Sequence, residues 1–187
     1  TLAYQWSRRP PLITKPAPNV VVRLCSIECD FAHPLSSPLT NGDFARDLTG
    51  WARLAGARRL FVWDYVTNFK EYFVPFPNYG VLVPNARFLY KHGVVGVFEE
   101  GVYNTNGGDL SQLKNYLIAR ALWSADEGPH YDAHWSAAMR DADADTSEFL
   151  LGYYGEGSAP LIRRYMNEMQ SVELHSSGLR MGESFDV

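Results

Sequence analysis

The stretch LFVWDYV, residues 60–66, decides the fold together with a later stretch, VVGVFEEG, residues 94–101. Each is a short apolar run with β-branched and aromatic residues, which is the pattern of a buried strand. Each follows a polar segment with helical periodicity, and strands that alternate with helices predict a parallel sheet. In parallel α/β folds the chemistry lies at the carboxyl ends of the strands. Those ends carry Asp64, Glu99 and Glu100.

Two further strands are predicted upstream of these stretches. Four strands, at residues 1–6, 19–28, 59–65 and 94–99, should therefore pair in parallel in that order, joined by right-handed crossovers. Apolar residues at helical spacing predict helices at residues 43–55, 78–91, 109–123, 146–154 and 160–172. The acidic segment between the third and fourth helices, residues 124–145, has no clear period and is expected to be an irregular, solvated connection.

The element count suggests part of a larger α/β fold. A complete eight-stranded barrel needs about 250 residues, and this chain has 187. We therefore expect the second half, strands five to eight, of a TIM-type (β/α)8 barrel followed by C-terminal helices. Residues 1–123 would form the partial barrel and residues 124–187 its helical extension, with the missing N-terminal half of the same domain as a partner. A doubly wound open sheet is the alternative, but no Gly-rich phosphate fingerprint follows any strand.

Composition excludes some partners and leaves the compartment open. The net charge is -4, the pI is about 5.7, and no basic stripe is present, so no nucleic-acid partner is expected. The longest apolar runs are too short to span a bilayer. The chain begins with Thr1 and shows no signal peptide. We expect a piece of a longer protein, whose localisation is unknown.

Asp64 and Glu99 are the predicted catalytic pair. Glycoside hydrolysis needs two carboxyl groups that flank one bond. Asp64 shares its side of the strand with aliphatic residues, whereas three aromatic residues occupy the other side. Because bulky aromatics suit a strand–helix interface, Asp64 and Glu99 are predicted to face the barrel axis, and Glu100 to matter much less. One of two close carboxyl groups should have a raised pKa. The alternative is a pair of salt-bridged carboxylates that only tie strand ends to loops.

Residues near the same strand ends are predicted to bind substrate. They are Glu28, His33, Tyr65, Asn68, Glu100 and Tyr103. The aromatic loop at residues 69–76 either stacks on sugar rings or plugs the barrel mouth. Cys25, Cys29 and His33 recur at a spacing of four, but a zinc site needs three or four ligands and no fourth is nearby. We therefore expect two free thiols, no metal and no other cofactor.

Several segments, taken in order, resemble a known family. They are residues 19–28 followed by FAHPL (31–35), VWDYVTNF (62–69), PFPN (75–78), GVVGVFEEG (93–101), residues 117–123 and GYYG (152–155). This family is glycoside-hydrolase-like, is known as domain of unknown function 4838, and is related in architecture to hexosaminidase and α-glucuronidase barrels. The resemblance covers nearly the whole chain and implies a (β/α)8 barrel that binds or cleaves a glycan or glycoconjugate.

The chain departs from that family pattern in two places. The N-terminal half of the domain is absent, and related barrels commonly carry an acid carboxylate on strand four. Residues 124–145 are also longer and more acidic than the pattern predicts. The leading hypothesis is a glycoside-hydrolase-like fragment, inactive alone, that acts on a glycan through strand-end carboxylates. The alternatives are a non-catalytic carbohydrate-binding barrel and a structural fragment with no activity alone.

Overall fold

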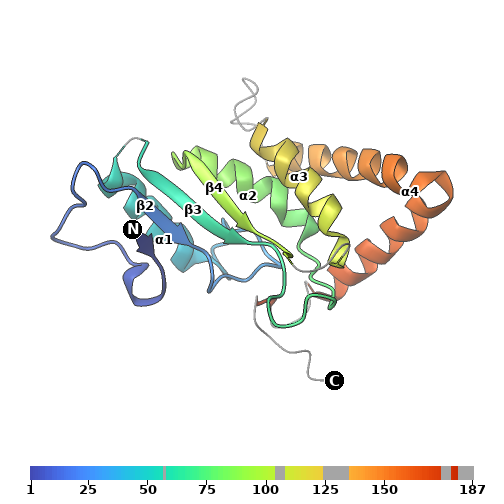
Figure 1. Cartoon of the computed structure of the whole chain (residues 1–187), viewed down its shortest axis with the longest axis horizontal. Coiled ribbons are helices and arrows are strands. Elements are labelled where there is room, and N and C mark those ends of the chain that lie inside the picture. Colours follow the sequence, from blue (N-terminus) through green and yellow to red (C-terminus); the bar gives the residue numbers. More distant parts are fainter. Residues whose placement is uncertain (57, 104–107, 124–134, 174–177, 181–187) are drawn as a thin grey trace.

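The computed structural model describes residues 1–56, 58–103, 108–123, 135–173 and 178–180, with only the backbone described for 135–141 and 173. Its centre is a parallel four-stranded sheet in the order β1-β2-β3-β4 (Figure 1). The strands are β1 (Leu2–Ala3), β2 (Val22–Cys25), β3 (Leu60–Tyr65) and β4 (Gly96–Glu100). The predicted strand order and the parallel pairing are confirmed, although β1 and β2 are shorter than expected.

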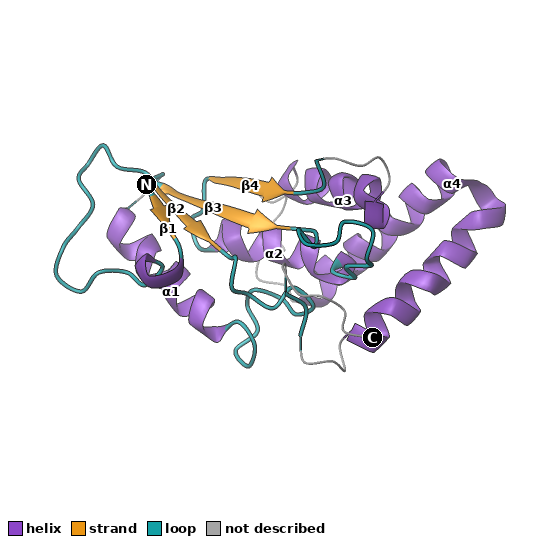
Figure 2. Cartoon of the chain, turned by 60° about the horizontal axis from the view of Figure 1, so that its bottom comes forward, coloured by secondary structure: helices purple, strands orange, loops and turns teal. Residues whose placement is uncertain are grey.

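Helices follow the strands as the sequence pattern predicts. The bounds are α1 (Gly42–Ala55), α2 (Tyr79–Lys91), α3 (Ser111–Trp123) and α4 (Trp135–Glu173), with short 3-10 turns η1 (Gln5–Ser7) and η2 (Gly108–Leu110). Figure 2 shows α1 and α2 on one face of the sheet, and no described helix covers the other face. The described helices are neither long enough nor apolar enough to cross a membrane.

The acidic segment is not an irregular connection throughout. Residues 135–145 belong to α4, and residues 124–134 lie outside the described residues. Alanine is the best helix former, so the alternation of Ala and Asp extends the helix rather than breaking it. Asp143 and Asp145 form ion pairs with Arg163 and Arg120. The two later predicted helices are likewise joined within α4, at a bend where Gly155 has φ 77° and ψ 168°.

The core lies between the sheet and its two helices. Leu60 and Val62 are fully buried in one cluster with Leu48 of α1 and Leu89 of α2. A second cluster joins α2, α3 and α4. The first cluster holds the strands against α1 and α2, and so fixes where the carboxyl ends of the strands lie.

The predicted assignment of strand faces was wrong. The aliphatic side of β3 packs against the helices, whereas Trp63 contacts Phe98 on the open face, at 4.7 Å between ring centroids. Phe61 lies over Gly96, where a Cβ atom would collide with the ring. Helix α1 already supplies bulky side chains to the core, among them Phe44. The strands therefore present small residues to the helices and aromatic residues to the open face.

Candidate functional site

Two carboxyl groups meet at the ends of β3 and β4. Asp64 and Glu99 are direct partners in the parallel register. Because register partners share one face of a sheet, both point toward the helix-covered face and not toward a barrel axis. Asp64 is only 4% exposed. Glu99 is partly exposed as a residue, but its Oε2 is buried and has no hydrogen-bond partner among the described residues.

Burial and proximity keep a proton on this pair. Burial raises the pKa of Asp64 to about 6, although a hydrogen bond donated by the Ser26 hydroxyl to Asp64 Oδ1 opposes this. Burial, followed by the charge of Asp64, raises the pKa of Glu99 well above its ordinary value. A charged carboxylate is disfavoured in a dry site and next to a like charge. Burial and the charge of Asp64 therefore both favour the protonated form of Glu99.

The acid cavity lies beside Glu99. We use this name for a cavity of about 590 Å³ bounded by the end of β4, the residues that follow it and the start of α3. Glu99, Glu100 and Tyr103 line it, whereas Asp64 does not. Glu100 Oε2 accepts a hydrogen bond of 2.6 Å from the indole Nε1 of Trp63. Glu100 thus lines the same cavity as Glu99, which the alternation of side chains along the strand does not predict.

Lys114 lines the acid cavity and was not anticipated. Its ammonium is buried and donates to Val66 O at 3.1 Å, to Phe76 O at 2.8 Å and to Asp109 Oδ2. Burial lowers its pKa, while Asp109 opposes that shift. The lysine therefore fixes the segment after β3 to the start of α3. Its signal in the sequence is its position beside Leu113 on the buried face of the predicted helix.

The other residues predicted near β3 and β4 have mixed roles. Tyr65 is buried and packs edge-on against Phe69, and burial raises its pKa. Asn68 accepts hydrogen bonds from two backbone amides of its own loop, at 2.9 and 3.3 Å. Tyr103 is exposed at the cavity and its ring contacts Tyr72. Of these three residues, only Tyr103 lines the acid cavity.

Glu28 and His33 lie away from the acid cavity. Glu28 pairs with Arg8 at 2.6 Å and lines a second cavity, at the end of β2. His33 Nδ1 lies 2.7 Å from Asp30 Oδ2. The Asn41 side chain holds the same loop through bonds to the backbone of Asp30, His33 and Pro34. His33 therefore contributes to the contacts that hold the loop after β2 together, and it does not line the acid cavity.

The two cysteines are free and buried. Burial raises the pKa of both thiols, most strongly that of Cys29. Within the described ranges, no group of three or more His, Cys, Asp or Glu side chains is arranged to hold a metal ion. The regular spacing of Cys25, Cys29 and His33 does not bring them together as ligands.

The family described as "Domain of unknown function (DUF4838)" matches residues 1–167 of the chain. No curated protein matches, and no solved structure matches. The arrangement of charges at the sheet edge is therefore the basis on which a function is assigned.

Proposed function

Because the chain belongs to the DUF4838 family, whose description names no reaction, we propose from its site that the protein acts on a glycan through carboxyl groups at the ends of β3 and β4. The observation that carries this proposal is the Glu99 carboxyl. It lies at the wall of a cavity, it has a buried oxygen without a partner among the described residues, and its pKa is raised by burial and by Asp64. A general acid for glycoside cleavage needs these properties.

Each carboxyl group then has its own role. Glu99 donates its proton to the glycosidic oxygen of a sugar in the acid cavity. Asp64 does not line that cavity, so it acts as a positioning residue whose charge keeps Glu99 protonated. Glu100 lines the cavity and accepts from Trp63, so it is placed to bind sugar hydroxyls. Tyr103 offers an exposed ring at the same cavity.

A barrel fold would be consistent with the same proposal. Parallel sheets are usually covered on both faces, and here one face carries Trp63 and the partly exposed Phe98 without a described helix above it. We assign this sheet to one half of a (β/α)8 barrel whose other half covers that face. A carboxylate from the other half would then approach the acid cavity from the open face, on the side of Glu100, and would supply the second carboxyl group that hydrolysis requires.

Binding without cleavage is the second candidate function. It is favoured by the aromatic residues at the acid cavity, Phe98 and Tyr103, which line it together with the carboxyl groups. In that case Glu99 would donate a hydrogen bond to a sugar hydroxyl rather than a proton to a leaving group.

The test uses the full-length protein and a panel of aryl glycosides, including glucuronides. Glu99→Gln should lower the hydrolysis rate by about 10²- to 10⁴-fold, as expected when a general acid is lost. Asp64→Asn should move the basic limb of the pH–rate profile to lower pH, because the charge that raises the pKa of Glu99 is gone. Glu71→Gln, at an exposed loop position, is the matched control and should change neither.

The outcomes are distinct. If Glu99→Gln hydrolyses every substrate as fast as the parent protein, the acid assignment is wrong. If no substrate is hydrolysed but Glu99→Gln weakens oligosaccharide binding, the binding function replaces the catalytic one. If binding is also unchanged, the carboxyl groups are structural and the proposal fails. Thermal melts of each variant establish that it is folded.

A further inference from the structure

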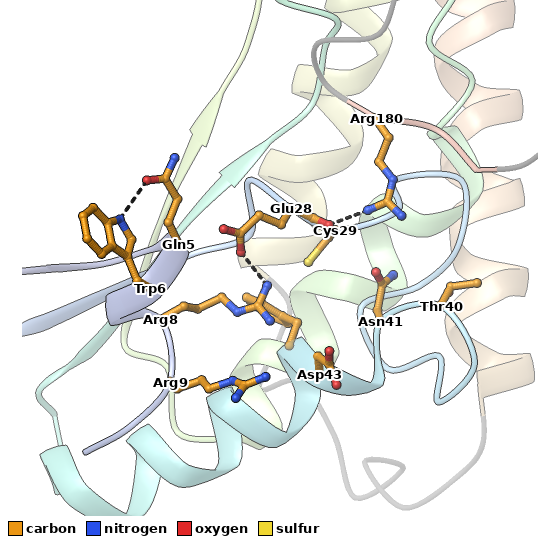
Figure 3. Close-up of a pocket in the computed structure, with 11 residues that line it drawn as sticks. Gln5, Trp6, Arg8, Arg9, Glu28, Cys29, Thr40, Asn41, Asp43 and Arg180 are labelled. Carbon is orange, nitrogen blue, oxygen red and sulfur yellow. Dashed lines mark hydrogen bonds and ion pairs between the residues drawn. The ribbon is translucent and has the colours of Figure 1, made fainter. Parts of the chain in front are cut away.

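A second cavity, the arginine cavity, lies at the end of β2 (Figure 3). It measures about 570 Å³ and is bounded by η1 and the residues after it, the loop after β2, the start of α1 and Arg180. Three of its lining side chains are the arginines Arg8, Arg9 and Arg180. Its two lining carboxylates are Glu28 and Asp43. This concentration of guanidinium groups in one hollow is not used by the proposed glycan chemistry.

Existing ion pairs account for some of these charges. Arg8 donates to Glu28 at 2.6 Å and to Asp47 at 2.8 Å. Asp43 forms an ion pair with Arg46, which lies outside the cavity lining. Arg8, Glu28 and Asp43 therefore already have opposite charges in contact.

The charges of Arg9 and Arg180 are not matched in this way. Among the described residues, neither forms an ion pair with a carboxylate. Arg180 instead donates from Nη1 to the backbone oxygen of Glu28 (Figure 3). Guanidinium groups are well suited to bind carboxylate or sulfate through paired hydrogen bonds. Two of them at one cavity without a carboxylate partner favour an anionic ligand.

Arg180 is held at the cavity by its own backbone neighbours. The amide of Leu179 donates to Asp30 Oδ1 at 3.0 Å, and the amide of Phe31 donates to Leu179 O at 2.8 Å. The Leu179 side chain is buried in the sheet core. Arg180 lies beyond residue 167, where the family match ends. The guanidinium is thus delivered by a docked segment and not by a chance surface contact.

Trp6 adds an apolar surface to the same cavity. Its side chain is 93% exposed, and its indole Nε1 donates to Gln5 Oε1 at 3.2 Å. Sites for small molecules typically combine an apolar surface with a few placed polar groups. An exposed indole beside guanidinium groups matches a sugar ring that carries a negative charge.

We infer that the arginine cavity binds the anionic substituent, a carboxylate or a sulfate, of a sugar residue. Arg9 and Arg180 contact the anion and Trp6 stacks on the ring. The sugar part of this inference rests on the proposed function. The arginine cavity and the acid cavity lie at the same carboxyl edge of the sheet, after β2 and β4 respectively. The arginine cavity would therefore select charged glycans for the site at Glu99.

The experiment compares three probes on the full-length protein by calorimetry or NMR titration. They are glucose, glucuronate and glucose 6-sulfate. The charged sugars should bind at least about tenfold more tightly than glucose, because charge-assisted hydrogen bonds to arginine are the strong ones. The stronger of the two charged sugars identifies the substituent. Equal binding of all three probes would overturn the inference.

Variants locate the binding. Arg9→Gln and Arg180→Gln should each weaken binding of the charged sugar about tenfold and leave glucose unchanged, whereas Trp6→Ala should weaken all three probes alike. Arg53→Gln makes the same charge change at an exposed position of α1 outside this cavity, and should have no effect. If Arg53→Gln weakens binding as much as Arg180→Gln, the effect is one of net charge and the inference fails.

The two proposals can fail separately. Glu99→Gln should leave binding of the charged sugar at the arginine cavity unchanged while it removes hydrolysis. If no glycoside is cleaved but the arginine variants lose the charged sugar, the reaction is wrong and the anion site stands. If hydrolysis depends on Glu99 but no arginine variant changes any affinity, the reaction stands and the anion site is wrong. Arg180→Lys, which keeps the charge without the planar fork, should retain intermediate affinity.

Discussion

Arg8, directly after η1, lies between two carboxylates, those of Glu28 and Asp47. Asp64 and Glu99, at the ends of β3 and β4, are instead partners in the parallel register, and the charge of Asp64 raises the pKa of Glu99. Both groups lie along one edge of one sheet. Opposite charges in contact offset the cost of burying the Arg8 guanidinium and the Asp47 carboxylate, while Glu28 is more exposed. Like charges in a dry site require a proton. The first arrangement is typical of a structural cluster, and the second of a site that handles protons.

A cation, the ammonium of Lys114, lies close to the carboxyl group of Glu99. It lines the same cavity as Glu99. An ammonium has three protons to donate, and Lys114 directs them to Asp109 and to the carbonyls of Val66 and Phe76. The positive charge at the acid cavity is therefore already neutralised by Asp109. This leaves Glu99 with burial and Asp64 as the main influences on its pKa.

The largest expected loss of stability comes from removing the charge of Lys114, which lines the acid cavity and forms an ion pair with Asp109. Lys114→Met leaves Asp109 buried without its partner, which is expected to cost about 3–5 kcal/mol of unfolding free energy. Urea denaturation at pH 7 measures the loss. Lys91→Met, at an exposed position in the last turn of α2, should stay within about 0.5 kcal/mol of the parent protein. Equal losses in both variants would show that the Lys114 pairing adds nothing.

The next effect is the pH dependence that the acid pair imposes. The pKa of Asp64 is raised from 3.8 to about 6 in the folded state, so the folded protein binds more protons than the unfolded chain between these values. Stability should therefore fall as pH rises from about 4 to above 6. A shift of about two units corresponds to about 3 kcal/mol, and the raised pKa of Glu99 extends the fall toward higher pH.

Asp64→Asn sharpens this test. It removes one titrating group and the charge that raises the pKa of its neighbour, so the curve of stability against pH should become flatter. Chemical denaturation at pH 4.5, 6 and 7.5 compares the two proteins. If the parent and variant curves run parallel, Asp64 and Glu99 do not bind an extra proton in the folded state. The proposed difference between this pair and the ion pairs of Arg8 would then be wrong.

A smaller loss of stability is expected when Arg8 is removed from its ion pairs with Glu28 and Asp47. Arg8→Gln removes the partner of Asp47 and of the more exposed Glu28, and should cost about 2 kcal/mol, between the values for exposed and buried ion pairs. The loss should be the same at pH 6 and pH 8 because arginine stays charged throughout. Arg46→Gln removes an ion pair whose side chains are 74% and 63% exposed, and should cost at most about 0.5 kcal/mol. A loss at Arg8 that changes between the two pH values would contradict the comparison.

Local sequence patterns predicted where the strands lie, but they did not predict which side of each strand packs against the helices. Apolar runs located β3 and β4, and their matching carboxylates predicted the partnership of Asp64 with Glu99. The face of a strand depends on which helices pack against it and on the bulk they bring, as Phe44 does here. Gly96 also created space for Phe61 on the open face. Neither fact can be read from one strand alone.

The arginine cavity lay beyond the reach of sequence patterns for another reason. Glu28 was recognised because it follows a strand, as Asp64 does. Arg180 meets Glu28 across 152 positions of chain, and no periodicity links two such residues. Lys114, by contrast, lies on the buried face of α3 together with Leu117 and Ile118, three and four residues further along the helix. A charged residue in such a stripe is a signal that a buried partner exists.

The bond between the Leu179 amide and Asp30 spans 149 positions of chain, and this has a consequence during synthesis. Asp30 leaves the ribosome long before residue 179 does, so this bond of the loop after β2 cannot form until residue 179 has been translated. Closing so long a loop costs more conformational entropy than closing a short one. Contacts between residues so far apart in the chain therefore form late in folding. A nascent chain that ends before residue 180 lacks the guanidinium that Arg180 brings to the arginine cavity. Selection of charged sugars would then begin only after residue 180 has been synthesised.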